Sequence, residues 1–297
     1  MKPGMRPSET AEGVAFARAL ASYEYDARLQ CPDDMGRYLI GPLYRFYSLP
    51  GVRVFARRKY ERELPGNYTY HIARTRHIDD IFSAQVASGV KQFVILGAGL
   101  DTRAYRFAKR LESARVFEVD HPATSAWKRK RLRSVLGALP SSVIYVPVDF
   151  ERHTLGEQLA SSGFDLSQKT FFLWEGVSMY LTITAIDSTF AFVTSAAPGS
   201  TLVFDYFNTD VFAHPSRYRG GVEVFERVKQ LGEPYTYGMD PEGMDDFLAA
   251  RGMRVLSHTR AEDFVRAYAD VSGPQHRYSM LEFWGVVHGE VITPSIR

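Results

Sequence analysis

The sequence predicts a doubly wound α/β protein, in which helices cover both faces of a mostly parallel sheet. From Gly89 onward, short apolar runs rich in β-branched and aromatic residues alternate with segments of helical spacing. Strands that alternate with helices in this way form parallel sheets through crossover connections. The runs are nearly continuous in apolar residues, which is typical of strands buried on both faces.

Seven strands are predicted from these runs. They lie at residues 93–96, 116–119, 143–146, 170–174, 201–204, 254–257 and 281–287. A helix over residues 261–268 is predicted between the last two strands. In an open sheet of this kind, ligands bind at the carboxyl ends of the strands. We therefore look for functional residues where the predicted strands end.

Two further segments differ from this alternation. Residues 1–88 show mostly helical spacing with interruptions at glycine and proline, which predicts an N-terminal cap made of several helices. Residues 207–243 form an aromatic insertion punctuated by glycine and proline, long enough for a partial lid. The predicted organisation is a helical cap over 1–88 and an α/β core over 89–297 that contains the lid.

Composition argues against several classes of protein. The 36 basic and 34 acidic side chains leave a formal charge of +2, which gives no overall field for a nucleic acid or a membrane surface. Cys31 is the one cysteine, so neither an internal disulfide nor a cysteine-based zinc site is expected. No stretch approaches the ~20 apolar residues of a membrane span, and the first residues do not resemble a leader peptide. We expect a cytoplasmic protein with no nucleic-acid or membrane partner.

The segment Gly97-Ala98-Gly99 closes the first predicted strand and precedes a predicted helix. Glycines in such a turn permit positive φ and a close approach of the backbone to a ligand, and a helix start offers free amide groups. Taken singly, the pattern also fits a tight turn that binds nothing. A dinucleotide site would have a third glycine where this chain has Thr102, so a nicotinamide cofactor is disfavoured.

Asp120 lies at the end of the second predicted strand, about 20 positions after Gly99. A carboxylate at this place accepts hydrogen bonds from ribose hydroxyls. The alternative role is a helix N-cap, because Pro122 marks a helix start and aspartate is a good cap. The residue pattern alone leaves both roles open.

Several motifs along the chain point to a known family. The three longest are GAGLDTRAYR at 97–106, VFEVDHP at 116–122 and WEGVSMYL at 174–181. Three shorter ones are ARTR at 73–76, VDF at 148–150 and GEP at 232–234. In this combination the chain resembles the leucine carboxyl methyltransferase family, and within it the bacterial S-adenosylmethionine-dependent O-methyltransferases of the tetracenomycin polyketide type. The resemblance implies a class I methyltransferase fold, a Rossmann-like sheet whose last strand is antiparallel.

The resemblance also implies a site for S-adenosylmethionine, with S-adenosylhomocysteine as product and without a metal. Arg74 would pair with the carboxylate of the cofactor, a role that suits the rigid guanidinium fork. Asp120 would hold the ribose, and Glu175 would lie near the amino group or the sulfonium. The other implied cofactor residues are Gly97, Ala98 and Gly99 at the methionyl portion, and Asp149 with Phe150 at the adenine.

One role in this site stays unassigned. The family has a second basic residue, nearer the N-terminus, that meets the cofactor. The candidates here are Arg53, Arg57, Arg58 and Lys59. A different basic run, residues 128–131, predicts a solvated helix face rather than a phosphate site. The histidines show no metal-binding spacing.

The methyl acceptor is expected to be a carboxyl or hydroxyl group of a small, polyketide-like molecule. Tyr180, Tyr206 and Arg217 are the candidate residues for positioning it. A carboxylate acceptor, with a pKa of about 4, is already ionised and needs no catalytic base. A phenol, with a pKa of about 10, does need one. The candidate bases are His71, His77 and His214.

Three other functions remain open at this point. The acceptor group can belong to a protein, in which case the chain is a protein carboxyl methyltransferase. A nicotinamide-dependent oxidoreductase would use the same glycine turn for a pyrophosphate. A noncatalytic protein that retains the fold would bind the cofactor without turnover.

Overall fold

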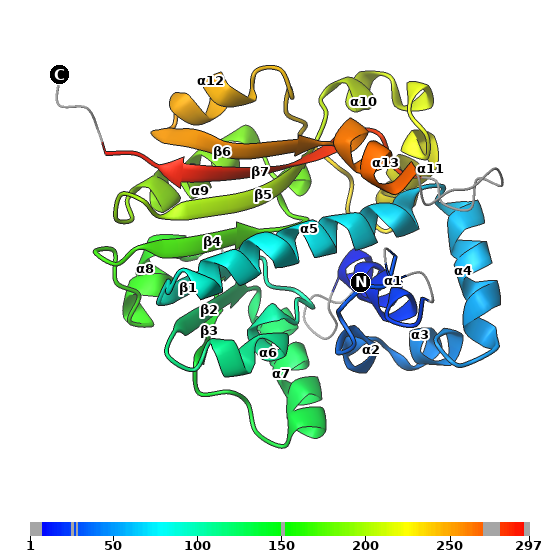
Figure 1. Ribbon diagram of the computed structural model, residues 1–297, viewed down its shortest axis with the longest axis horizontal. Helices are drawn as coiled ribbons and strands as arrows, with labels where there is room; N and C mark the ends of the chain where they lie inside the picture. The colour runs from blue at the N-terminus through cyan, green and yellow to red at the C-terminus, as the bar shows by residue number, and fades with distance from the viewer. Residues whose placement is uncertain (1–7, 25–26, 28, 150–151, 270–279, 294–297) are drawn as a thin grey trace.

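The computed structural model describes residues 8–24, 27, 29–149, 152–269 and 280–293. Its centre is a seven-stranded sheet with the order β3-β2-β1-β4-β5-β7-β6, which Figure 1 shows edge to edge. The strands are β1 (Gln92–Leu96), β2 (Arg115–Asp120), β3 (Val143–Pro147), β4 (Thr170–Trp174), β5 (Thr201–Phe207), β6 (Met253–Arg260) and β7 (Trp284–Val291).

The described helices occupy the N-terminal region and both faces of the sheet. Before β1 the chain forms α1 (Glu9–Ala21), α2 (Gly36–Leu39), α3 (Pro42–Tyr47), α4 (Val52–Glu63) and α5 (Asn67–Ala87). Between β1 and β5 lie α6 (Arg103–Arg106), η1 (Ala108–Arg110), α7 (Pro122–Leu136), α8 (Leu155–Ser161), η2 (Ser178–Tyr180) and α9 (Ile183–Thr194). After β5 come α10 (Asp210–Ala213), η3 (Pro215–Arg217), α11 (Gly221–Gln230), α12 (Met244–Ala249) and α13 (Ala261–Ala269).

The strand pairing confirms the predicted fold class. Strand β1 is parallel to β2 and to β4, and β4 is parallel to β5. Strand β7 inserts between β5 and β6 and is antiparallel to both. It begins at Trp284 rather than at the predicted residue 281. Leu281 is buried, but its amide donates to the carbonyl of Gly66, outside the sheet. An apolar run in the sequence does not show whether its backbone pairs within the sheet or with another segment.

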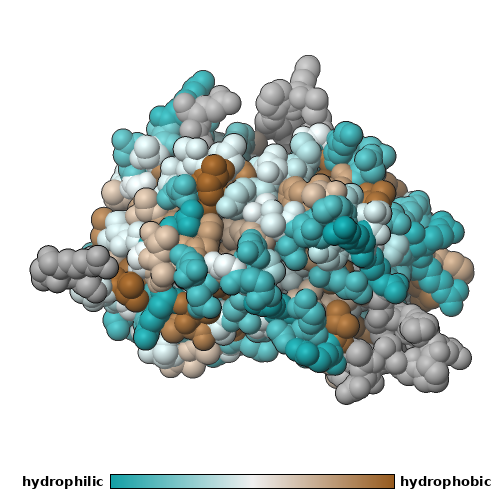
Figure 2. Space-filling view, turned by 90° about the horizontal axis from the view of Figure 1, so that it is seen from above, coloured by the Kyte–Doolittle hydropathy of each residue, from teal (hydrophilic) through white to brown (hydrophobic). Residues whose placement is uncertain are grey.

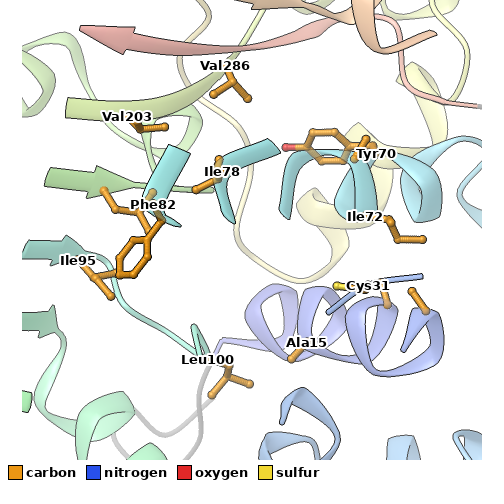
Figure 3. Packing of buried hydrophobic residues seen from close by; sticks show 14 of the residues in the cluster. Ala15, Cys31, Tyr70, Ile72, Ile78, Phe82, Ile95, Leu100, Val203 and Val286 are labelled. Carbon is orange, nitrogen blue, oxygen red and sulfur yellow. The ribbon is translucent and has the colours of Figure 1, made fainter. Parts of the chain in front are cut away.

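Two hydrophobic clusters fill the space on the two faces of the sheet. One joins α1 and α5 to residues of β1, β4, β5 and β7, so the predicted cap and the predicted core share a continuous packed interior. Figure 3 shows Ile78 and Phe82 of α5 between that helix and strand residues such as Ile95 and Val203. The other cluster holds the apolar side chains of α8, α9 and α12 against the opposite face.

The surface is mixed in character. On the face that Figure 2 shows, strongly hydrophobic residues occur in small separate groups among polar ones. Within the described residues, no helix combines the length and apolarity that crossing a membrane requires. Of the twelve large hydrophobic side chains exposed among the described residues, five lie in α3, α4 and the turn between them.

Candidate functional site

A cavity of about 550 Å³ lies at the carboxyl ends of β1, β2 and β4. Because these strands are parallel, the residues that follow each of them meet at one edge of the sheet. Gly97 follows β1, Asp120 ends β2, and Glu175 follows β4. The cavity is lined by residues of these strand ends, of α1 and of the insertion: Ser8, Thr10, Ala11, Val14, Arg18, Arg74, Ile95, Leu96, Gly97, Ala98, Gly99, Leu100, Asp101, Asp120, Thr124, Glu175, Gly176, Val177, Tyr180, Gly232, Glu233, Pro234 and Thr236.

The glycine turn forms the floor of this cavity. Gly97 and Gly99 both have positive φ, at 65° and 41°, a conformation that other residues adopt at a cost. A Cβ on Gly97 would lie 2.5 Å from Cγ2 of Val177, so a larger residue there would displace the loop after β4. The helix predicted after Gly99 is a single turn, Arg103–Arg106. The turn therefore allows a ligand to approach the backbone closely, and the helix that follows it has only four residues.

The carboxylate of Asp120 binds the glycine turn and faces the cavity. It accepts hydrogen bonds from the backbone amides of Gly99 and His121. The alternative role as an N-cap is excluded, because the cap of α7 is His121, whose Nδ1 accepts from the amide of Ala123 at 3.3 Å. Burial raises the pKa of Asp120 above its usual range, although the two amides oppose the shift. The carboxylate thus lies at the edge of the first cavity.

A continuous chain of buried ion pairs lies beside the cavity. Arg18 of α1 pairs with Asp33, and Asp33 pairs in turn with Arg106. Asp79 of α5 joins Arg106 to Arg103, with N–O distances of 2.8 and 2.6 Å. Thr102, the position that lacks the third glycine, donates its hydroxyl to Asp33 at 2.7 Å. The side chain that rules out a dinucleotide fingerprint thus supports this network.

The chain of ion pairs ends at Arg74, between two carboxylates. Nε of Arg74 lies 2.9 Å from Oε1 of Glu175, and Nη1 lies 2.7 Å from Oδ2 of Asp205. Glu175 is also held by Nη1 of Arg103 at 2.5 Å. Burial alone would raise the pKa of Glu175, but Arg103 and Arg74 outweigh it and lower the pKa to about 2. Glu175 is therefore ionised at neutral pH.

Arg18 is a site residue that sequence reasoning missed. It lines the cavity with Ala11 and Val14, at helical spacing on one face of α1. That spacing was the available signal, but a short helix rich in alanine gives no indication of which face meets a ligand. Of the four candidates for the second basic residue, Arg57 instead pairs with Glu24 at 2.7 Å. Arg53 lies over the ring of Tyr23.

The predicted adenine residues are placed less completely. Asp149 lies next to β2, because the amide of Val148 donates to the carbonyl of Asp120. Its side chain is 32% exposed and 3.5 Å from Nε of Arg152, and it is not part of the cavity lining given above. Phe150 lies outside the described residues. The adenine contacts stay a prediction.

A second cavity, of about 330 Å³, adjoins the first and is mostly aromatic and aliphatic. Helices α1, α4 and α5, the loop after β4 and helix α11 surround it. On α5, the residues Asn67, Tyr70, His71 and Arg74 follow one helical face. The remaining lining is Glu9, Thr10, Gly13, Val14, Phe16, Leu43, Tyr44, Tyr47, Ala56, Lys59, Tyr60, Glu63, Leu64, Gly176, Met179, Tyr180, Phe207, Val224, Arg227, Val228, Leu231 and Tyr235.

The two cavities meet at a shared set of residues. Thr10, Val14, Arg74, Gly176 and Tyr180 line both. The ring of Tyr180 packs against that of Tyr235 in the insertion, with 5.0 Å between centroids. The two cavities are therefore adjacent, with these residues as their common wall.

The insertion and the start of α1 together cover the first cavity. Oγ of Ser8 donates to Oε2 of Glu233 at 2.9 Å, and the hydroxyl of Thr10 donates to the same oxygen. Glu233 belongs to the GEP motif, all three residues of which line the cavity. The motif thus connects the predicted lid to the N-terminal helix.

Two of the three predicted acceptor residues lie away from both cavities. Tyr206 is buried in β5, and its hydroxyl is 2.7 Å from Nε2 of His258. The side chain of Arg217 is 64% exposed, and Nη1 lies 3.7 Å from Oδ2 of Asp210. Tyr180 is the predicted acceptor residue that the structure brings to the junction. The sequence alone did not show which of the three residues would lie at a cavity.

The candidate bases are likewise separated. His71 is buried and lines the second cavity, and burial lowers its pKa well below the ordinary value, with a further contribution from Arg74. His77 lies against Phe264 and 3.3 Å from the hydroxyl of Thr259. His214 is on the surface, 2.9 Å from Asp210. His71 is thus neutral at pH 7 and is the candidate base that lines the second cavity.

The structure corrects the prediction that the basic run at 128–131 is a solvated helix face. Lys128 is not on a solvated face: its side chain is 2% exposed and Nζ lies 2.9 Å from Oε1 of Glu118. It is on the inner face of α7 with Ser125 and Leu132, which are also buried. In the described part of the chain, no cluster of three or more histidine, cysteine or acidic residues is arranged to hold a metal.

Comparison with known sequences agrees with this geometry. A family model described as leucine carboxyl methyltransferase matches residues 11–194. A Mycolicibacterium gilvum protein is 33% identical, with 86% of this chain and 85% of that protein covered. A Bacillus subtilis protein is 32% identical, with 65% of this chain but only 63% of that protein covered. Both carry the name "Putative S-adenosyl-L-methionine-dependent methyltransferase", with YktD added for the Bacillus protein.

Solved structures agree in fold. A methyltransferase-like protein from Thermobifida fusca has a TM-score of 0.59 at 14% identity, covering 97% of this chain and 96% of that one. A DUF574 family protein from Streptomyces avermitilis has a TM-score of 0.57 at 13% identity, covering 93% and 96%. From the family model and the relatives, this chain belongs to the leucine carboxyl methyltransferase family and is an S-adenosylmethionine-dependent methyltransferase.

Proposed function

We propose that the chain methylates an oxygen atom, in a carboxyl or hydroxyl group, of a small apolar molecule of polyketide-like character. The observation that supports this is the junction of the two cavities at Arg74, Gly176 and Tyr180. A cofactor in the polar cavity and an acceptor in the aromatic one would touch there. Methyl transfer is an in-line displacement, so holding the two reactants in contact supplies much of the rate.

The charges beside the polar cavity fit S-adenosylmethionine. The chain of ion pairs contains four arginines, at 18, 74, 103 and 106, and five carboxylates, at 33, 79, 101, 175 and 205. Its formal charge is therefore −1. S-adenosylmethionine, when bound, supplies an electrophilic methyl group on a positively charged sulfur. With its ammonium and carboxylate it has a net charge of +1, whereas S-adenosylhomocysteine has lost the sulfonium charge, so the site favours the reactant over the product.

The aromatic cavity fits an acceptor with a flat or aliphatic body. Phe16, Tyr44 and Phe207 present ring surfaces to it, and such surfaces exclude water around the reacting oxygen. Its volume of about 330 Å³ falls in the range of small-molecule sites, which favours a small molecule over a protein acceptor. His71 is the histidine that lines this cavity, but burial lowers its pKa. It is therefore a weak base for a phenol, which favours a carboxylate acceptor that needs no base.

Labelled methyl transfer into a metabolite extract, followed by mild alkali, tests this function. Release of the label as methanol means an ester, and retention means an ether. The purified chain should first bind S-adenosylmethionine and S-adenosylhomocysteine in equilibrium titration, with NAD as the negative comparison. Binding of both cofactor forms without transfer to any extract component would contradict the proposal.

A further inference from the structure

Helices α3 and α4 and the turn between them form an exposed apolar corner, which we define as residues 42–63 and call the α3–α4 corner. Twelve large hydrophobic side chains are exposed among the described residues, and five of them lie in this corner. They are Leu43, Phe46, Leu49, Val54 and Phe55, which are between 49% and 70% exposed. Large apolar side chains gathered on one surface mark an interaction site.

The same corner is strongly basic. Its 22 residues include six basic side chains, five of them arginine, and two acidic ones, a formal charge of +4 in a chain whose total is +2. The rest of the chain is therefore at −2. Arg57 is paired with Glu24 outside the corner, which leaves a local charge of +3. On α4, the exposed residues Val54, Phe55, Arg58 and Arg62 follow one helical face, so apolar and cationic groups point the same way. The expectation of no membrane partner rests on the total charge, which conceals this local excess.

The corner also borders the entrance of the aromatic cavity. Leu43 and Lys59, both exposed, line the cavity together with Tyr44 and Tyr47 of α3, which are partly buried. Figure 1 shows α3 and α4 at the outer edge of the molecule, on the side of α1 away from the sheet. Leu43 and Lys59 thus connect the exposed surface of the corner with the wall of this cavity.

We propose that the α3–α4 corner docks on an anionic lipid surface. Exposed aliphatic and aromatic side chains beside arginines are what the interface of an anionic membrane takes up, because the apolar groups enter the acyl region and the cations remain at the headgroups. A second copy of the chain is a poorer occupant, since two corners that each present a charge of +3, with the Arg57–Glu24 pair counted, would repel each other. A consequence, which rests on the proposed function, is that the methyl acceptor is an amphiphile that partitions into lipid.

Vesicle flotation of the full chain tests the docking directly. Vesicles of phosphatidylcholine with phosphatidylglycerol should carry the protein upward, vesicles of phosphatidylcholine alone should carry much less, and added salt should release it. The double variant Val54→Ser/Phe55→Ser removes the apolar tips, and Arg58→Glu/Arg62→Glu reverses the charge. Each should weaken binding at least about tenfold. None of these four residues lines either cavity. Arg58, a candidate for the second basic cofactor residue by sequence, is exposed and lies outside both cavities, a position that does not support that role. The affinity for S-adenosylmethionine should therefore stay unchanged and reports that the variants are folded.

Matched variants elsewhere on the surface serve as controls. Leu166→Ser/Leu256→Ser removes two side chains of similar exposure, 46% and 45%, and Lys130→Glu/Arg133→Glu reverses two exposed charges on α7. Both should bind vesicles as the unchanged chain does. Three results would overturn the proposal: no flotation with anionic vesicles, equal loss in control and corner variants, or a solution dimer by light scattering that the corner variants dissociate. If the unchanged chain does not bind S-adenosylmethionine, the proposed function is contradicted, but the flotation result remains valid.

Discussion

Arg74 and Glu175 form a buried ion pair, 2.9 Å from Nε to Oε1, at the boundary between the polar and the aromatic cavity. Arg74 comes from helix α5 and Glu175 from the loop after β4, about 100 positions later. Each is held from its other side as well, Arg74 by Asp205 and Glu175 by Arg103. The pair is thus fixed in place before a ligand arrives, which reduces the cost of ordering the site on binding.

The first prediction concerns the carboxylate of Glu175. Glu175→Gln keeps the size of the side chain but removes the charge that faces the cavity. The dissociation constant for S-adenosylmethionine should rise about 10- to 100-fold, the worth of a hydrogen bond to a charged group. Calorimetric titration measures it. Glu242→Gln is the matched control, because Glu242 pairs with Arg260 outside both cavities. An unchanged constant in Glu175→Gln would refute the assignment of Glu175 to the cofactor.

The second prediction concerns stability. Asp205 is fully buried and accepts from Arg74, from the hydroxyl of Tyr70 and from the amide of Gly176. Asp205→Ala removes a buried acceptor from all three donors, so the free energy of unfolding should fall by about 3–5 kcal/mol. Denaturant titration measures the loss.

The control for Asp205→Ala is an ion pair on the surface. In Arg254→Ala, the pair with Glu290 is lost from a site where the arginine side chain is 65% exposed. The free energy of unfolding should then change by less than about 1 kcal/mol. Equal effects of the two variants would show that the buried chain of ion pairs does not hold the site together.

The third prediction separates two tyrosines that the sequence did not distinguish. Tyr180→Ala removes the ring at the junction of the cavities, so methyl transfer should slow by about 100-fold if the acceptor is misplaced by an ångström or so. Tyr206→Phe, in contrast, loses only the hydrogen bond to His258 and should keep the rate of the unchanged chain. Steady-state kinetics with the acceptor found in the extract experiment provides the measurement. Equal rates for both variants would remove Tyr180 from the acceptor site.

The fourth prediction is a pH dependence of stability that originates in the sheet. His288 of β7 lies opposite Val203, and its buried Nε2 has no hydrogen-bond partner within the described residues. Burial lowers the pKa of His288 from 6.5 to about 4. Between these two values the unfolded chain binds a proton that the folded chain does not, so stability is complete above pH 6.5 and falls as the pH drops towards 4.

The variant His288→Phe should remove this part of the acid sensitivity. Its melting temperature should fall less between pH 7 and pH 4.5 than that of the unchanged chain. His214→Phe is the control on the surface, where the histidine side chain is 44% exposed, and it should follow the unchanged chain. If all three proteins lose the same number of degrees, His288 is not the origin of the acid sensitivity.

The fold was predictable because its determinants are local. The strand β4 follows from the run Thr170–Trp174 and β2 from the run around Val119, since an apolar β-branched or aromatic stretch of this length has few alternatives. Parallel pairing follows from the helices between strands. The glycine turn at Gly97 was predictable for the same reason, because its positive φ is a property of that one residue.

Side-chain placement was not predictable in the same way. The basic run at 128–131 looks uniformly solvated in sequence, yet Lys128 is buried against Glu118. Arg18 carries no motif, yet it lines the first cavity. A helix presents one face to the interior, and the face is chosen by the packing of neighbouring elements rather than by the charge of a single residue.

By itself, the sequence determined the order of the elements, the glycine turn and the carboxylates that end β2 and follow β4, because these depend on residues near each other in the chain. Only the tertiary structure decided which tyrosine and which histidine line the second cavity. It also decided that Arg18, Arg103 and Arg74 belong to one chain of ion pairs. Those contacts join α1, α5 and the strand ends, and a contact between distant segments exists only once the sheet has brought their ends to one edge.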